Sequence, residues 1–67
     1  MTPQEVFNAM QEGNSVKIIN KEYLQNNEIE NNIFIVMCIY CDDVISLIDD
    51  KGNVYSDLYV NDIILFF

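Results

Sequence analysis

Apolar positions at the start of the chain follow the spacing of a helix. Val6, Phe7 and Met10 recur three to four residues apart, which places them along one stripe of a helical surface. Residues 2–5 (TPQE) provide a capping threonine, a proline at the first helical position and the glutamate of a capping box. Gly13 can adopt the left-handed conformation that ends a helix. We therefore expect a helix of about ten residues, or roughly 15 Å, in this segment.

The rest of the chain consists of apolar runs, typical of strands, separated by polar segments, typical of turns. The expected strands are residues 16–20, 33–40, 44–48, 54–55 and 63–67. Residues 42–43 (DD) predict a turn, and residues 50–53 (DKGN) predict a hairpin turn in which Gly52 adopts a positive φ. The polar residues 21–32 predict a loop with a strand edge or a short turn, and residues 56–61 are irregular or briefly extended.

These elements predict a single α+β domain that spans residues 1–67. Its N-terminal helix is followed by a small antiparallel sheet or a partly rolled barrel of four to five strands. The strands after residue 32 are expected to form a meander of three or four. A domain of this size buries only about 60% of the surface of its unfolded chain, so it is marginal as a monomer.

Two of the expected strands are apolar on both faces. Ile33–Tyr40 and Ile63–Phe67 lack the alternation of a half-exposed strand. One short helix covers only part of one sheet face, and a barrel would leave its outer side in water. We therefore expect the remaining apolar surface to be buried against another copy, in a dimer or tetramer. A tightly rolled monomer, with residues 21–32 folded over the second face, is the alternative.

The charge of the chain restricts its possible partners. Three lysines against eleven acidic residues give a formal net charge of −8. Such a protein has no general basic patch for the phosphate backbone of DNA or RNA. Its acidity suits solubility, repulsion of nucleic acid, or contact with a basic partner surface, of which nucleic-acid mimicry is one form. With no signal-peptide pattern and no apolar run of about 20 residues, we expect a cytoplasmic protein that does not enter the membrane.

Residue types that usually carry catalysis or bind metals are sparse. The chain has no histidine, and the CxxC pair Cys38 and Cys41 lacks further zinc ligands, although two such pairs across a dimer could supply four thiolates. A redox role is disfavoured because Cys38 lies in an apolar strand, so a buried thiol is the simpler interpretation. Acid pairs at 42–43 and 49–50 flank turns, where Asp bonds locally, though paired carboxylates can also bind a divalent cation. We expect no enzyme, no cofactor and no metal site.

Tyrosine and asparagine side chains offer a different chemistry. Tyr rings, including those of Tyr23 and Tyr59, can stack on bases, and Asn amides can pair with base edges or ribose hydroxyls. Asn20, Lys21 and Tyr23 lie together in sequence, and two of the three lysines are in or near this segment. With nearby backbone N–H groups they are conceivable parts of a nucleotide site, although ordinary surface or core is the simpler interpretation of each.

Two segments resemble a known family of small phage proteins. Residues 1–17 (MTPQEVFNAMQEGNSVK) and 59–67 (YVNDIILFF) are similar to the opening and closing segments of the Thoeris anti-defence 2 family. The resemblance implies an α+β homotetramer that captures cyclic ADP-ribose-type or cyclic dinucleotide signals between subunits without cleaving them. By matching position it implies the following contacts: Asp62 with the base or ribose, Tyr23 as an aromatic wall, and Asn31 or Asn32 as a polar contact.

Three hypotheses for the function remain at this point. The first is a phage anti-defence protein that sequesters a cyclic nucleotide or ADP-ribose-derived immune signal. The second is an acidic inhibitor that binds a basic surface of a host or defence protein, with nucleic-acid mimicry as one form of such binding. The third is a small accessory subunit without a ligand.

Overall fold

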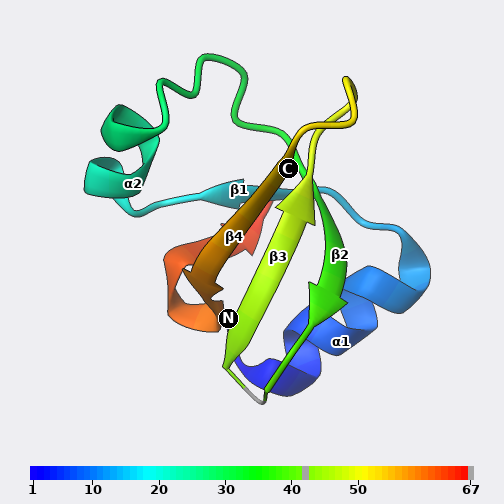
Figure 1. Cartoon of the computed structure of the whole chain (residues 1–67). Coiled ribbons are helices and arrows are strands. Elements are labelled where there is room, and N and C mark those ends of the chain that lie inside the picture. Colours follow the sequence, from blue (N-terminus) through cyan, green and yellow to red (C-terminus); the bar gives the residue numbers. More distant parts are fainter. Residues whose placement is uncertain (42, 67) are drawn as a thin grey trace.

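The computed structural model describes residues 1–41 and 43–66 (Figure 1). The elements are α1 (Pro3–Glu12), β1 (Val16–Ile18), α2 (Lys21–Asn26), β2 (Ile35–Ile39), β3 (Val44–Ile48), β4 (Val54–Tyr59), the 3-10 helix η1 (Val60–Asp62) and β5 (Ile63–Leu65). Within these residues no helix is long and apolar enough to cross a membrane. The α+β class is confirmed.

The strands form two antiparallel sheets that meet along one seam. β1 pairs with β5, and β2, β3 and β4 form a meander. At the seam, Val16 N–H donates to the Phe34 carbonyl over 2.8 Å, and Phe34 N–H donates back over 3.0 Å. The Asn32 side chain extends this pairing, because its amide accepts from Ile18 N–H and donates to Ile18 C=O, each at 2.8 Å. The five strands therefore lie side by side in the order β5-β1-β2-β3-β4.

The five strands do not close into a barrel. Their arrangement corresponds to the small, partly rolled antiparallel sheet that the sequence predicts. β5 joins β1 rather than the meander, so the meander has three strands. The chain passes from β4 to β5 through η1, so that a 3-10 turn interrupts the last stretch of strand.

The core lies between the two sheets and α1. It contains Val6, Ala9, Val16, Ile18, Phe34, Val36, Ile45, Leu47, Leu58, Val60 and Ile63. Phe34 packs edge-on against Tyr55, with ring centroids 5.4 Å apart. Phe7, which the helical stripe included, is exposed, because the buried side of α1 is set by Val6 and Ala9.

The ends of α1 are as the sequence predicts. Thr2 Oγ1 accepts from Glu5 N–H at 3.2 Å, and the Glu5 carboxylate accepts from Thr2 N–H at 2.8 Å. Such a cap is worth about 1 kcal/mol. Gly13 follows the helix at φ +69° and donates to the carbonyls of Ala9 and Met10.

The prediction of a loop is wrong for residues 21–26, which form α2. Asn20 caps this helix, because its side-chain oxygen accepts from Tyr23 N–H at 3.1 Å. The segment KEYLQN is rich in good helix formers, and Tyr23 and Leu24 pack against the core. Tertiary contact thus stabilises a six-residue helix that would not persist alone.

The remaining boundaries differ by a few residues from those expected. The long apolar run forms a strand only at Ile35–Ile39, and the last strand is Ile63–Leu65. Residues 56–59 continue β4 before η1 begins. The hairpin turn is confirmed, with Gly52 at φ +86°. Predictions that involve Asp42 and Phe67 lie outside the described residues.

Candidate interaction surface

The outward side chains of the meander form rows across its three strands. At one end Ile35, Ile48 and Val54 lie opposite one another. At the other end Tyr40 N–H donates to the Val44 carbonyl, and Val44 pairs with Tyr59. Because side chains alternate between faces of a strand, the core residues between these rows point the other way.

Two bulges set the middle of this face. On β2, Cys38 rather than Met37 lies opposite Ser46, so that Met37 and Cys38 both face outward. On β4, Ser56 and Asp57 lie at the level of Ser46, and Asp57 has a positive φ of 62°. The bulges therefore flank the same residue of the central strand.

We call this surface the open face. It consists of Ile35, Met37, Cys38, Tyr40, Val44, Ser46, Ile48, Val54 and Tyr59. None of these residues is charged, and Tyr40 and Tyr59 are 59% and 53% exposed. Figure 1 shows β2, β3 and β4 in the foreground, with β1 crossing behind them and no element over the near side. Within one chain the described residues leave the second face of this apolar strand uncovered, and residues 21–32 do not fold over it as the monomeric alternative required.

Ser46 is an unusual member of the open face. It is completely buried, and its hydroxyl has no hydrogen-bond partner among the described residues. A buried hydroxyl without a partner destabilises the folded state, since it has lost its bonds to water.

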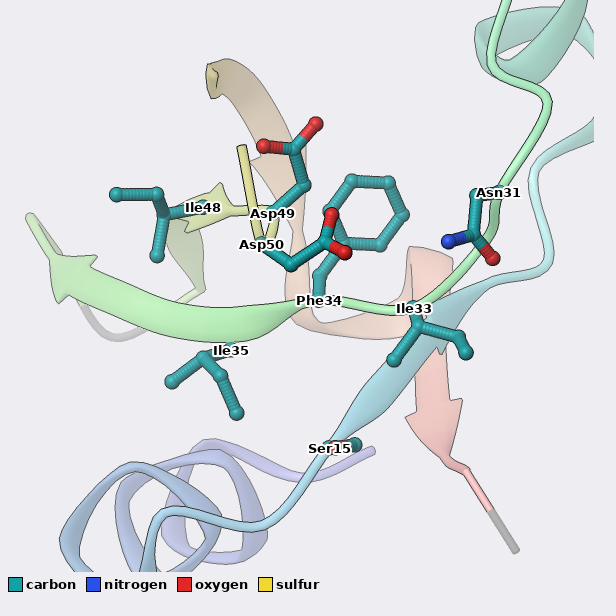
Figure 2. A pocket seen from close by; sticks show the side chains of 8 residues that line it. All are labelled: Ser15, Asn31, Ile33, Phe34, Ile35, Ile48, Asp49 and Asp50. Atoms are coloured by element: carbon teal, nitrogen blue, oxygen red, sulfur yellow. The ribbon is translucent and has the colours of Figure 1, made fainter. Parts of the chain in front are cut away.

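A hollow of about 240 Å³ lies at the end of the open face near the β3–β4 turn (Figure 2). Its lining is Ser15, Asn31, Ile33, Phe34, Ile35, Ile48, Asp49 and Asp50. Figure 2 shows Ile33 and Ile35 on the same side of their chain segment, opposite Phe34. Ser15 has a small side chain here, at the seam where β1 and β2 diverge. We call this space the apolar hollow.

A second hollow of about 180 Å³ adjoins the first and shares Asn31, Asp49 and Asp50 with it. Its lining also includes Glu28, Ile29, Glu30, Lys51, Asn53 and Tyr55. Its lining thus includes four acidic residues and one lysine. We call this space the acidic hollow.

Hydrogen bonds hold the carboxylate of Asp49 in place between the hollows. Its Oδ1 accepts from the backbone N–H of Lys51 at 3.0 Å and of Asn53 at 2.8 Å, and its Oδ2 accepts from the Asn53 side chain at 3.1 Å. Partial desolvation acts to raise the pKa of Asp49, but these bonds outweigh it and the pKa is lowered. The group therefore carries its negative charge at neutral pH.

Several residues that the sequence suggested as nucleotide contacts come together, but they bind one another. Asn20 Nδ2 donates to Asp62 Oδ1 at 3.2 Å, while Asp62 Oδ2 accepts from Tyr59 N–H at 2.9 Å. Asn20 also caps α2 through Tyr23 N–H. These contacts join the start of α2 to η1, which gives the polar groups a structural role.

The other suggested contacts are dispersed. Tyr23 OH donates to the Ser56 carbonyl at 2.6 Å and ties α2 to the bulge of β4. Desolvation, aided by the charge of Asp57, raises the pKa of Tyr23. Lys21 is exposed on α2, and Asn32 is bonded to the backbone of β1. Asn31 alone of these residues lines the hollows.

The cysteines and acids do not form a metal site in the described part of the chain. Cys38 is half-buried and Cys41 is exposed, and both are free. Residues 1–41 and 43–66 contain no group of three or more Cys, Asp or Glu side chains placed to bind a metal ion.

The sequence interpretation missed Asp49, Asp50, Ile33, Ile35 and Ile48 as members of a surface site. The Asp pair was assigned to local turn bonding, which is true of Asp49 but leaves its charge at the hollow. The isoleucines lie in uniformly apolar runs, where alternation cannot separate outward from inward positions.

No protein-family model, no curated protein and no solved structure matches the chain.

Proposed function

We propose that the chain is a non-catalytic binding protein that works as a homo-oligomer, and that its target is a protein with a basic surface. The open face carries the proposal. On a chain with a net charge of −8, the nine residues of the open face carry no charge, and the charged residue that adjoins them in the β4 bulge is Asp57. An apolar patch of this kind marks an interaction site.

A second copy suits the open face better than a basic partner does. Copies of an acidic chain repel one another, so they meet most favourably where charged side chains are absent. In a two-fold interface the end of the open face that carries Tyr40, Val44 and Tyr59 would pack against the same end of the other copy, which leaves the hollow beside Ile35 and Ile48 accessible. A standard interface takes about 800 Å² from each partner. That is roughly a fifth of the 4430 Å² surface of this chain.

A basic protein target is supported over an anionic nucleotide by the hollows. Four acidic residues line these hollows, and their carboxylates would repel phosphate. The Asn20, Tyr23 and Asp62 groups that could contact a base are bonded within the chain. The second hypothesis from the sequence, an acidic inhibitor of a host or defence protein in the bacterial cytoplasm, is therefore our conclusion.

Sedimentation analysis tests the oligomer. We expect the chain at about 100 µM, well above the dissociation constant of a stable dimer, to sediment as more than one 7.8 kDa copy. Tyr40→Glu places a charge in the open face at an exposed position and should give monomers. Phe7→Glu is the matched control, because Phe7 is 44% exposed on α1, outside the open face. Sedimentation of the wild-type chain as a monomer would refute the proposal that it works as a homo-oligomer.

A capture experiment tests the target. The chain is immobilised on a resin and incubated with a bacterial lysate. It should retain a basic protein that elutes as the salt concentration is raised, because salt screens ionic contacts. In a parallel sample a cyclic nucleotide should remain in solution. Depletion of the nucleotide, with release of intact ligand on denaturation, would instead establish the nucleotide-sequestering function.

A further inference from the structure

We infer that the two hollows form one docking site for an extended basic segment of the partner protein, with an aliphatic side chain in the apolar hollow and a lysine or arginine in the acidic hollow. This inference rests on the proposed binding function and names the chemistry of its target.

The shape of the site fits side chains of a peptide. The hollows adjoin at Asn31, Asp49 and Asp50, so one segment can reach both. Side chains two residues apart in an extended segment point the same way and are about 7 Å apart. Ile33, Ile35 and Ile48 provide the apolar contacts for the first of them. The site lies at one end of the open face, away from Tyr40 and Tyr59.

Charge complementarity selects a basic segment. The acidic hollow is lined by Glu28, Glu30, Asp49 and Asp50 against the single ammonium group of Lys51. A second copy would bring further acids, and a nucleic acid would bring phosphates, so both are repelled. Lysine and arginine can cover apolar surface with their methylene stems while their charged ends reach carboxylates.

The backbone at Glu28 makes this residue a suitable test position. Glu28 follows α2 at φ +52°, the left-handed position where glycine is the favoured residue. The N–H of Ile29 donates to the Leu24 carbonyl at 3.0 Å across this helix end. Glycine can therefore replace Glu28 without a conformational cost, so that Glu28→Gly removes the carboxylate and keeps the fold.

Fluorescence anisotropy with labelled hexapeptides tests the inference on the full chain. The peptide Lys-Ser-Leu-Ser-Lys-Ser, which carries lysine and leucine two residues apart on one face, should bind, and replacing its leucine with serine should weaken binding about tenfold, since the apolar contact is lost. Replacing its lysines with glutamate should abolish binding. Affinity should fall between about 50 mM and about 300 mM salt.

Substitutions in the chain locate the site. Glu28→Gly should raise the thermal stability and yet weaken peptide binding about fivefold, a combination that a merely structural glutamate would not give. Asp50→Asn should weaken binding similarly, whereas Asp43→Asn, an exposed acid at the other end of β3, should leave it unchanged. Equal binding of the leucine and serine peptides, or equal losses from Asp50→Asn and Asp43→Asn, would overturn the site.

Failure of this inference can be separated from failure of the proposed function. Capture of a basic protein that is unaffected by Glu28→Gly and Asp50→Asn would retain the proposed function and reject this site. Peptide binding that follows the substitutions in a chain that sediments as a monomer would retain the site and reject the oligomer.

Discussion

Replacement of Asn32 by alanine should cost a large part of the stability of the fold. The Asn32 amide makes two hydrogen bonds of 2.8 Å to the backbone of Ile18, a residue that is 1% exposed. Without the amide, one N–H and one C=O remain partly buried and unpaired, at about 1–2 kcal/mol each, so we expect a loss of about 2–4 kcal/mol. A domain of this length has a total stability of roughly 3–10 kcal/mol.

Urea denaturation measures this loss. With a slope of about 1 kcal/mol per molar urea for so small a domain, Asn32→Ala should move the midpoint by about 2–4 M. Asn31→Ala is the matched control, because Asn31 is the exposed neighbour and should change stability by no more than about 0.5 kcal/mol. Equal effects of the two substitutions would refute the structural role assigned to Asn32.

A carboxyl at the same position adds a pH test. In Asn32→Asp, the ionised carboxylate can accept from Ile18 N–H but faces the Ile18 carbonyl, whereas the protonated acid can donate to that carbonyl. The folded state therefore favours the protonated form and raises the pKa of the introduced group. Its stabilising contribution should be present at low pH and lost as pH rises through the raised pKa. A loss that is independent of pH would contradict this geometry.

Four further outcomes are expected. Ser46→Ala should raise the free energy of unfolding by about 1 kcal/mol, because it removes a buried hydroxyl without a partner. If urea denaturation instead gives a lower free energy of unfolding for this variant, the hydroxyl is bonded in the folded protein. Tyr23→Phe should lower the free energy of unfolding by about 0.5–1 kcal/mol through the lost bond to Ser56. Because the pKa of Tyr23 is raised, the protonated phenol contributes stability below the usual pKa of 10.0, and this contribution is lost as pH rises through the raised pKa. Thermal melts at alkaline pH should therefore show a fall in stability in the wild type that is absent from Tyr23→Phe. The lowered pKa of Asp49 has the opposite sign, so its contribution is present above 3.8 and lost as pH falls below it; Asp49→Asn should flatten the acid limb of the same melts, and an unchanged limb would count against its bonds to the turn.

Local chemistry predicted the parts of the fold that depend on neighbouring residues. The start of α1 follows from residues 2–5, and the hairpin follows from Gly52 and the preceding acids. α2 was missed because its capping asparagine and its six residues are stabilised by packing against the core, which no local pattern shows. The open face was missed for a different reason. Met37 in the bulge of β2 breaks the alternation, and both faces of the strand carry apolar residues.

The candidate site was predicted only in part. Asn20, Tyr59 and Asp62 do lie together, but their polar groups are paired within the chain, and the Tyr23 phenol bonds to Ser56 instead. Asn31 lines the hollows, yet most of its neighbours there come from a turn and from strands distant in sequence. Proximity that arises from the pairing of strands cannot be obtained from a single sequence without their register.

The pairing of β1 with β5 also affects how the chain folds. β2, β3 and β4 pair with neighbours in sequence, whereas Val16 and Leu65 are paired across almost the whole chain. Pairings between distant segments form more slowly, because a longer loop must be closed first. The meander is thus expected to assemble before β1 and β5 join it. Until they do, the inner side of the meander is exposed as well as the open face, so the partly folded chain is most prone to aggregate at this stage.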